Sequence, residues 1–543
     1  MSLLEVRDLT VSYRTRNHVQ PAVSGISFAV ERGEVAAVVG ESGSGKSTTA
    51  HAIIGLLPAN GSVDSGQILL NGTDVAGWSS KRLESVRGAQ IGLIPQDPTS
   101  SLNPVRTIGA QIGETLRIHR RGDRRTVPRR VIELLDRVGL SDPELRARQY
   151  PHELSGGMRQ RVLIASAIAL EPQLVIADEP TSALDVTVQR RILDLIDDLR
   201  AEFGTAVILV THDLGVAADR SNRLVVMRDG RVEEQGATAA VLARPEAEYT
   251  RRLLRDAPSL TPRQFRDVRP PARIPDGEGA ASEQPYAVVA RDLVKEFRVG
   301  RKAFRAVDGV SFDVRRGTTH ALVGESGSGK TTTARMVVRF AAPTSGSVTI
   351  GGTDVARLRG EELRQLRRRV QLVYQNPAGS LDPRQSVGDI VAEPLRNFRL
   401  GDRAGRGRRV RDPIDRVALP QTVLDRKPRE LSGGQRQRVA IARALAVEPE
   451  VLVLDEAVSA LDVTVQGQIL DLFDGLQREL GLTYLFISHD LSVVRQISDT
   501  VSVMRKGRIV ETGTTRQVFE TPQHDYTREL LAAVPGAVAE LAA

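Results

Sequence analysis

The stretch "GESGSGKSTTA" occupies residues 40–50, and a near copy, "GESGSGKTTTA", occupies residues 324–334. Each copy has the pattern Gly-x-x-x-x-Gly-Lys-Ser/Thr and follows a short apolar run. Glycines at these positions allow successive backbone N–H groups to converge on an anion, and the start of the following helix adds positive potential. The sequence therefore predicts two phosphate-binding loops, each between a buried strand and a helix, with Lys46 and Lys330 reaching toward the phosphates.

The residues around each loop are also repeated. Five further pairs of stretches match in the same order along the chain: "QDPTSSLNP" at 96–104 and "QNPAGSLDP" at 375–383, "ELSGG" at 153–157 and 430–434, "DEPTSALDVTVQ" at 178–189 and "DEAVSALDVTVQ" at 455–466, "THDL" at 211–214 and "SHDL" at 488–491, and "EYTRRLL" at 248–254 and "DYTRELL" at 525–531. A repeat of this length indicates a duplicated domain and not a solenoid.

The joint between the halves lies at 256–285, a stretch rich in Pro, Gly, Ala and Arg that is typical of a partly extended linker. We therefore expect a first domain at 1–240, an extension and linker at 241–285, a second domain at 286–517 and a final extension at 518–543. The length of 543 residues is sufficient for such an arrangement.

The composition excludes several classes of protein. Without cysteine, the chain cannot form disulfides, thiolate zinc sites or cysteine-held iron–sulfur clusters. We find no signal segment and no apolar run near the ~18 residues that span a membrane, so we expect a cytoplasmic protein. The net charge of +8 permits a nucleic-acid partner, but arginine is spread over the whole chain, as in background usage. The densest cluster, "RAGRGRRVR" at 403–411, fits either a solvated loop or a functional patch.

The remaining pattern predicts an α/β fold. Apolar runs at 33–40, 173–178 and 205–213 have the length of buried strands, and 186–204 has apolar residues at helical spacing. Strands that alternate with helices indicate a central parallel sheet in each half.

Two of the predicted strands end in adjacent acids, Asp178-Glu179 and Asp455-Glu456. The aspartate can hold Mg²⁺ through water, together with the hydroxyl of Ser47 in the first half or Thr331 in the second, and the glutamate can act as a general base on water. The alternative is a capped strand end that faces solvent. The four apolar residues before each acid pair disfavour it, because a buried strand ends in paired carboxylates only for a reason such as a cation.

Single polar residues follow other predicted strands. His212 and His489 fit a contact with the terminal phosphate, although a lone histidine there is more often a structural cap. Gln96 and Gln375 also end apolar runs, and an ordinary polar residue at a strand end remains an equal alternative for both.

An aromatic residue precedes each phosphate loop at the same distance, Tyr13 in the first half and Phe297 in the second. Such a ring could stack on adenine, and aromatic residues make up only 3% of the chain, which gives the coincidence weight. A core aromatic is the alternative.

Together with "LSGGM" at 154–158 and "LSGGQ" at 431–435, these motifs resemble the ATP-binding-cassette family over nearly all of both halves. The resemblance implies a P-loop NTPase architecture, duplicated, with a RecA-like core, a helical signature subdomain and a small antiparallel β part in each half. It also implies that two cassettes pair head to tail, with ATP between the P-loop of one and the signature of the other. The physics agrees, because Ser155-Gly156-Gly157 opens a predicted helix and its N–H groups form an anion site.

The resemblance assigns ATP and Mg²⁺ as ligands. It implies nucleotide contacts at Tyr13, Gly40, Ser42, Gly43, Gly45, Lys46, Ser47, Thr48, Ser155, Gly156 and Gly157, and at Phe297, Gly324, Ser326, Gly327, Gly329, Lys330, Thr331, Thr332, Ser432, Gly433, Gly434 and Gln435. It implies Mg²⁺ ligands at Ser47, Gln96, Asp178, Thr331, Gln375 and Asp455, and catalytic groups at Glu179, Glu456, His212, His489, Gln96 and Gln375. Met158 stands where the second half has Gln435, and we expect it to remove one neutral hydrogen bond, worth about 0.5–1.5 kcal/mol, without inactivating the site.

The finer resemblance is to the two ATPase subunits of oligopeptide and dipeptide importers, here fused in one chain. It implies two transmembrane permease subunits, an extracytoplasmic substrate-binding protein, no nucleic acid and one copy of the chain per transporter, at the cytoplasmic face of the membrane. An importer of nickel or glutathione remains an alternative, as does a tandem-cassette protein that acts on ribosomes or DNA. Some relatives hold an iron–sulfur cluster in the extension, which this cysteine-free chain cannot do in the usual way.

Overall fold

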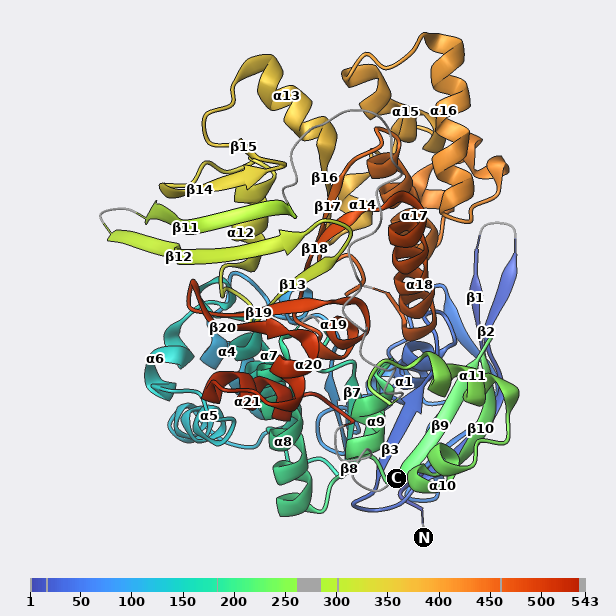
Figure 1. Cartoon of the computed structure of the whole chain (residues 1–543). Coiled ribbons are helices and arrows are strands. Elements are labelled where there is room, and N and C mark those ends of the chain that lie inside the picture. Colours follow the sequence, from blue (N-terminus) through green and yellow to red (C-terminus); the bar gives the residue numbers. More distant parts are fainter. Residues whose placement is uncertain are drawn as a thin grey trace. The chain divides into compact units, whose positions relative to one another are not determined.

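The computed structural model describes residues 2–15, 18–182, 184–260, 285–299, 302–459 and 461–536 (Figure 1). The chain divides into two compact units, Met1–Thr261 with Pro535–Ala543 and Pro262–Val534. Most of the predicted linker, residues 261–284, lies outside the described residues, and the domain boundaries remain a prediction.

Each unit contains a six-stranded mixed sheet whose central strands are buried on both faces. In the first unit the order is β10-β9-β3-β8-β7-β6, with all neighbours parallel except the edge strand β10. The bounds are β3 Val35–Val39, β6 Ile91–Ile94, β7 Leu174–Asp178, β8 Ala206–Val210, β9 Arg223–Arg228 and β10 Arg231–Ala237. The apolar runs predicted as strands form β3, β7 and β8, because side chains buried on both faces of a parallel sheet must all be apolar.

A second, antiparallel sheet of the first unit has the order β2-β1-β4-β5. Its strands are β1 Leu4–Arg14, β2 Val19–Val30, β4 Gly61–Leu70 and β5 Thr73–Asp74. The helices of this unit are α1 Lys46–Ile53, α2 Ser80–Leu83, α3 Pro98–Ser101, α4 Ile108–Ile118, α5 Thr126–Arg137, α6 Pro143–Arg148, the 3₁₀ turn η1 Pro151–Glu153, α7 Gly156–Ile168, α8 Val186–Phe203, α9 Leu214–Arg220, α10 Thr238–Ala243 and α11 Glu248–Asp256.

The second unit repeats this architecture. Its mixed sheet has the order β16-β17-β18-β13-β19-β20 and its antiparallel sheet the order β12-β11-β14-β15. The strands are β11 Tyr286–Val299, β12 Lys302–Arg315, β13 Thr319–Val323, β14 Ser345–Ile350, β15 Thr353–Asp354, β16 Val370–Val373, β17 Val451–Asp455, β18 Thr483–Ser488, β19 Thr500–Arg505 and β20 Arg508–Thr514.

The helices of the second unit are α12 Lys330–Val337, α13 Gly360–Arg369, α14 Pro377–Ser380, α15 Val387–Asn397, α16 Arg403–Arg416, the 3₁₀ turns η2 Gln421–Asp425 and η3 Pro428–Glu430, α17 Gly433–Leu445, α18 Val463–Leu480, α19 Leu491–Ile497, α20 Thr515–Glu520 and α21 Asp525–Ala532. Figure 1 shows α15 and α16 at the opposite end of this unit from its antiparallel sheet.

The two faces of the first unit's mixed sheet are covered by different clusters of apolar side chains. One cluster joins the sheet to α4, α5, α7 and α8, and the other joins it to α1 and the antiparallel sheet. Burial of each large aliphatic side chain contributes about 1.5–3 kcal/mol. Because both faces are covered, the functional residues are left at the carboxyl edge of the sheet.

The basic run at 403–411 corrects one expectation. It is not a loop but the first part of α16, which the Asp402 carboxylate caps by accepting a hydrogen bond from Gly405 N–H at 2.7 Å. Buried Val410 and Ile414 provide the apolar face that holds this helix despite its glycines. Among the residues that the structure describes, no helix is both long and apolar enough to cross a bilayer.

Candidate functional site

Backbone contacts require the glycines of the first phosphate loop. Gly40 has φ 148° and Gly45 has φ 99°, backbone conformations that residues with a side chain rarely adopt. A Cβ atom on Gly40 would lie 2.1 Å from the carbonyl oxygen of Met227, and one on Gly45 would lie 2.8 Å from that of Ala22. The loop is therefore held between β9 and β2 by contacts that only glycine permits.

The second loop repeats this geometry. A Cβ atom on Gly324 would lie 2.2 Å from the carbonyl oxygen of Met504, and one on Gly329 would lie 2.5 Å from that of Ala306. The buried ammonium of Lys330 donates hydrogen bonds to the carbonyls of Gly324 and Glu325, at 2.7 and 2.8 Å.

Lys46 lies in the same way in the first loop. Its Nζ donates to the carbonyl oxygens of Gly40 and Glu41, at 2.8 and 2.9 Å. Both lysines are thus fixed at the start of a helix, where backbone N–H groups already favour an anion.

The hydroxyl that follows each lysine contacts the predicted metal-binding aspartate. Ser47 Oγ donates to Asp178 Oδ1 at 3.0 Å, and Thr331 Oγ1 donates to Asp455 Oδ1 at 3.1 Å. Burial raises the pKa of both aspartates, and the hydroxyls only partly oppose this shift. A buried carboxylate beside a hydroxyl supplies hard oxygen ligands, and Mg²⁺ takes only one or two carboxylates from a protein and fills its shell with phosphates and water. The residues therefore fit Mg²⁺.

In the first half, the glutamate after the aspartate lies between the predicted glutamine and histidine. Gln96 Nε2 donates a hydrogen bond to Glu179 Oε2 at 2.7 Å, and His212 Nδ1 lies 3.1 Å from Glu179 Oε1. Glu179 has φ 47°, a strained left-handed conformation that its N–H helps to hold by donating to the carbonyl of Val210 at 2.9 Å.

The second half contains the same group. Gln375 Nε2 donates to Glu456 Oε2 at 2.7 Å, His489 Nδ1 lies 3.3 Å from Glu456 Oε1, and Glu456 has φ 50°. Neither glutamine is an isolated strand-end residue. The helices that follow the histidines are capped by Asp213 and Asp490 and not by the histidines themselves.

The glutamate and the histidine of each group shift each other's pKa in opposite directions. Burial opposes ionisation of Glu179, but the hydrogen bond and positive charge of His212 bring the pKa of Glu179 below its ordinary value. Burial also opposes protonation of His212, yet Glu179 raises the pKa of His212. Glu456 and His489 shift in the same directions for the same reasons. Each half therefore presents a carboxylate that can accept a proton, held by a histidine.

The two aromatic residues are not core residues. The hydroxyl of Tyr13 pairs with Thr48 Oγ1 at 3.1 Å, which orients its ring toward the first helix after the loop. Phe297 is 44% exposed, with Lys295 Nζ 5.3 Å from its ring centroid. Directly across the β11–β12 pair lies Phe304, a second exposed aromatic that the sequence reasoning missed.

The signature residues begin α7 and α17. Ser155 Oγ accepts a hydrogen bond from Met158 N–H at 3.3 Å, and Ser432 Oγ accepts one from Gln435 N–H at 3.3 Å. Gln435 Oε1 also accepts from Ser432 N–H at 3.1 Å, which completes a capping box. Met158 instead packs against the apolar cluster of the first half. In the second half, the side-chain amide of Gln435 caps the start of α17. Met158 has no amide, so the first half lacks the equivalent cap at the start of α7.

The two glycines of each signature differ in what surrounds them. A Cβ atom on Gly157 would lie 2.7 Å from Val188 Cγ1, and one on Gly434 would lie 2.5 Å from Val465 Cγ1, so both allow close packing on the neighbouring helix. The nearest atom to a Cβ on Gly156 is Leu184 Cδ2 at 3.8 Å, and no atom lies within 4 Å for Gly433. The first glycine has no steric role in its own half.

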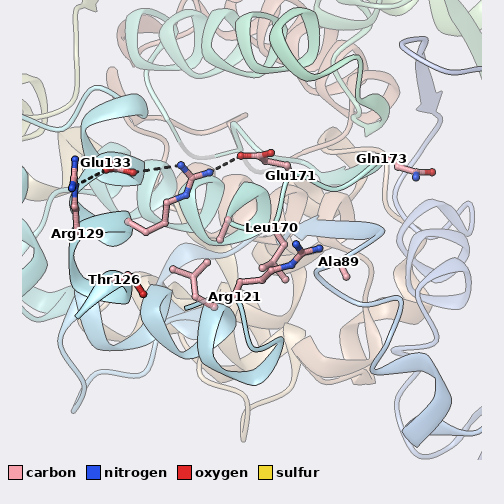
Figure 2. Close-up of a pocket in the computed structure, with 11 residues that line it drawn as sticks. Ala89, Arg121, Thr126, Arg129, Glu133, Leu170, Glu171 and Gln173 are labelled. Carbon is pink, nitrogen blue, oxygen red and sulfur yellow. Dashed lines mark hydrogen bonds and ion pairs between the residues drawn. The ribbon is translucent and has the colours of Figure 1, made fainter. Parts of the chain in front are cut away.

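Each unit has a surface depression that bears on the location of the site. In the first unit, one of about 600 Å³ is lined by a chain of ion pairs and contains no predicted site residue (Figure 2). There Glu133 lies 3.3 Å from Arg129 and 3.5 Å from Arg130, and Arg130 lies 2.5 Å from Glu171. In the second unit, one of about 830 Å³ contains the predicted Mg²⁺ ligands Thr331, Gln375 and Asp455.

Sequence reasoning also missed a contact between each C-terminal extension and its phosphate loop. The hydroxyl of Tyr249 accepts a hydrogen bond from Glu41 N–H at 3.2 Å, and that of Tyr526 accepts one from Glu325 N–H at 3.2 Å. The one available signal was a tyrosine repeated at the same place in both extensions of a chain poor in aromatic residues.

Comparison with protein families gives two matches. The family model described as ABC transporter matches residues 23–182 and 307–459. A model described as the C-terminal region of oligopeptide/dipeptide transporters matches residues 510–542.

Similar proteins extend over nearly the whole chain. The oligopeptide transport ATP-binding proteins OppD of Mycobacterium bovis and Mycobacterium tuberculosis are both 43% identical, over 98% of this chain and 98% of theirs. The glutathione import ATP-binding protein GsiA of Salmonella choleraesuis is 44% identical, over 98% of this chain and 89% of its own length. With two cassettes matched and each carrying a complete set of phosphate loop, acid pair and signature, the chain belongs to the ABC transporter family as an ATPase.

Proposed function

We propose that this chain supplies the ATP hydrolysis that drives a bacterial importer of short peptides. The observation that carries the proposal is the repeated Gln–Glu–His group beside a phosphate loop, in a chain whose oligopeptide-transport relatives align over 98% of both lengths. Glutathione is a second candidate substrate, because relatives named for its import are equally similar, and glutathione is itself a tripeptide.

In the proposed reaction, Lys46 and the loop N–H groups hold the terminal phosphate of ATP in the first half. Ser47 and Asp178 would hold Mg²⁺, which would supply positive charge beside the phosphate oxygens. Glu179 accepts a proton from the attacking water, the new bond forms to the terminal phosphorus, and the bond to the bridging oxygen breaks, so that ADP leaves with its charge. His212 keeps the Glu179 carboxylate ionised and oriented, and Gln96 holds its other oxygen. Glu456, His489 and Gln375 have these roles in the second half.

We further propose that the halves pair head to tail. The steric freedom at Gly156 and Gly433 supports this pairing, because the N–H groups at these helix starts remain accessible to a phosphate from the other half. Lys46 would then share one ATP with Ser432, and Lys330 would share the other with Ser155. The chain contains both cassettes, so one copy would serve each transporter.

The pairing can be tested by the amount of ATP that is held tightly. In a Glu179→Gln, Glu456→Gln background, Lys46→Ala with Ser432→Arg disables one proposed site twice, and about one ATP per chain should remain. Lys46→Ala with Ser155→Arg disables both sites, and no tightly held ATP should remain. The opposite pattern would show that each signature serves its own half.

The depression of about 830 Å³ suggests how a conformational change caused by ATP hydrolysis is passed to the membrane subunits. Its lining includes Thr331, Asp455 and Gln375 together with the aromatic residues Tyr374 and Phe398. The lining combines aromatic side chains with charged ones such as Arg443 and Glu393. A mixed groove of this kind beside metal ligands suits a short amphipathic helix from a membrane subunit, because a shift at the nucleotide would move the groove wall. We propose that two permease subunits dock at this groove and at the surface near Gln96, at the cytoplasmic face, and that an external binding protein delivers substrate.

The transport function is tested in proteoliposomes that contain the co-purified permease subunits and binding protein. Uptake of a labelled tripeptide should require both this chain and ATP, and unlabelled di- to pentapeptides or glutathione should compete according to the true substrate. Accumulation without this chain would disprove the proposal. Binding to ribosomes or DNA, with no membrane partner, would support the rival class instead.

A further inference from the structure

The helical extension after each cassette returns to the phosphate loop of its own half. In the first half, Tyr249 of α11 is 5% exposed, and its hydroxyl accepts a hydrogen bond from Glu41 N–H at 3.2 Å. In the second half, Tyr526 of α21 is 1% exposed and accepts from Glu325 N–H at the same distance, 3.2 Å. The same contact has therefore formed twice, between elements far apart in the sequence.

A carboxylate on the edge strand fixes each extension at the required place. Glu234 of β10 accepts hydrogen bonds from Glu246 and Ala247 N–H, at 2.8 and 3.1 Å, just before α11 begins. Glu511 of β20 accepts from Gln523 and His524 N–H, also at 2.8 and 3.1 Å. Burial acts against ionisation, but these N–H donors hold the pKa of both carboxyls below the ordinary value.

The tyrosine rings are held by the strand that contacts the loop glycine. The Arg228 guanidinium lies 5.0 Å from the Tyr249 ring centroid, and Arg505 lies 4.5 Å from that of Tyr526. Each arginine directly follows the methionine, Met227 or Met504, whose carbonyl abuts the first glycine of the loop. Extension, strand and loop thus meet at one corner.

We propose that each C-terminal extension braces the first peptide of its own phosphate loop, with Tyr249 and Tyr526 as positioning residues for nucleotide binding. This inference rests on the proposed role of the two loops. Glu41 and Glu325 directly follow the loop glycines with φ near +147°, and a hydrogen bond to their N–H limits the rotation of the peptide that joins them. A loop held in this way presents its other N–H groups to phosphate with less loss of conformational entropy.

The brace also predicts a reciprocal effect. If the extension favours the loop conformation that binds nucleotide, then nucleotide must favour the docked extension to the same degree. ATP should therefore slow the hydrogen exchange of α11 and α21, although neither helix carries a predicted nucleotide ligand.

The test is to remove each hydroxyl alone, in the full chain, with Tyr249→Phe and Tyr526→Phe. Without nucleotide, exchange at residues 40–46 should become about 2- to 10-fold faster in Tyr249→Phe and stay unchanged at 324–330, with the reverse in Tyr526→Phe. KM for ATP should rise by a similar factor while kcat changes less. Glu234→Gln should act in the same direction as Tyr249→Phe, because it loosens the helix that carries the tyrosine.

Tyr484→Phe is the matched control. Tyr484 is also buried, and its hydroxyl donates to a backbone carbonyl, that of Phe473 at 2.9 Å, within β18 and α18. Tyr484→Phe should lower the free energy of unfolding without changing the hydrogen exchange of either phosphate loop or the KM for ATP. Equal loop exchange in wild type and both extension variants, or an equal change in Tyr484→Phe, would overturn the brace. Exchange without nucleotide does not depend on transport, so failure of the proposed importer function would leave this result intact.

Discussion

At the scale of single residues, the site depends on a glutamate in a conformation that few side chains adopt. Glu179 and Glu456 have φ 47° and 50°, directly after a fully buried strand. This geometry turns the carboxylate away from the sheet and toward a glutamine and a histidine from neighbouring strand ends. The strain is consistent with a catalytic group, because such conformations persist where the surroundings hold them for function.

Glu179→Gln together with Glu456→Gln should reduce ATP hydrolysis by about 10²- to 10⁴-fold and leave ATP affinity within a few fold. An amide of nearly the same shape keeps the site intact but cannot accept the proton of water. Steady-state turnover and equilibrium ATP binding measure the two effects. Turnover equal to wild type would remove the general-base assignment.

Met158→Gln should close the capping box that Gln435 already makes in the second half, and should stabilise the start of α7 by about 0.5–1.5 kcal/mol. The relevant measurement is turnover in a Glu179→Gln background, where only the site proposed to include Met158 and Glu456 can hydrolyse ATP. We expect a change of less than about tenfold.

Gln435→Met in a Glu456→Gln background is the matched control for that substitution, and it should also change turnover by less than about tenfold. If Met158→Gln instead raised turnover from zero, the methionine would be an inactivating residue and not a neutral difference between the halves.

His320 predicts an acid-sensitive second half. It is 1% exposed in β13, pairs with Thr500 through Nδ1 at 2.8 Å and stacks on Phe312, with Asp313 the nearby charge that partly opposes the effect of burial. Burial lowers the pKa of His320 to about 4 from 6.5. The unfolded chain therefore binds the proton more tightly, so stability is complete above pH 6.5 and falls as the pH drops toward 4, by at most about 3 kcal/mol.

Urea unfolding at several pH values checks this, with far-UV circular dichroism for the whole chain and Trp78 fluorescence for the first half. His320→Leu should flatten the loss of stability between pH 6.5 and 4. Equal pH dependence in wild type and variant would contradict the assignment.

At the scale of elements, helix α18 shows which glycines of the chain are required. Gly475 is exposed inside this helix, and a Cβ atom there would have no neighbour within 4 Å, whereas Gly481 ends the helix with φ 64°. The two positions therefore respond to alanine in opposite ways, although both are glycines of one helix.

Gly475→Ala should raise the free energy of unfolding by about 0.5–1 kcal/mol, because alanine loses less backbone entropy in a helix. Gly481→Ala should lower it by about 1 kcal/mol, because a side chain is disfavoured in the left-handed conformation. Urea denaturation measures both. A stabilising Gly481→Ala would contradict the capping role.

The elements also show where sequence patterns succeed. Continuous apolar runs predicted β3, β7 and β8, and helical spacing predicted α8 almost to its ends, because burial on both faces or on one stripe leaves a direct pattern. The run at 403–411 was wrongly expected to be a loop, since its glycines and arginines hide the few apolar side chains that anchor α16. Tertiary packing overrides a weak local propensity there.

At the scale of the whole molecule, both cassettes belong to one chain. Under the proposed head-to-tail pairing, separate ATPase subunits would have to meet by diffusion, and their specific activity would fall on dilution. In a tandem chain the second cassette is always present at a high effective concentration.

The specific ATPase activity of this protein should therefore stay constant from micromolar to nanomolar concentration. The check is turnover per chain across that range, with the chain cleaved in the linker at 261–284 as the control, which should lose activity on dilution. A loss of activity by the intact chain on dilution would indicate that pairing occurs between molecules.

Local sequence patterns were enough to establish the duplication and the α/β class and to predict the site residues, because each of these leaves a run of glycines, apolar residues or paired acids. Which of these residues meet depends on the tertiary structure. Gln96, Glu179 and His212 follow three different strands, and only the order and register of the sheet bring their side chains within hydrogen-bond distance. The contact of Tyr249 with Glu41 depends on how α11 docks on β10, which is a long-range contact between side chain and backbone and leaves no periodic signal in the sequence.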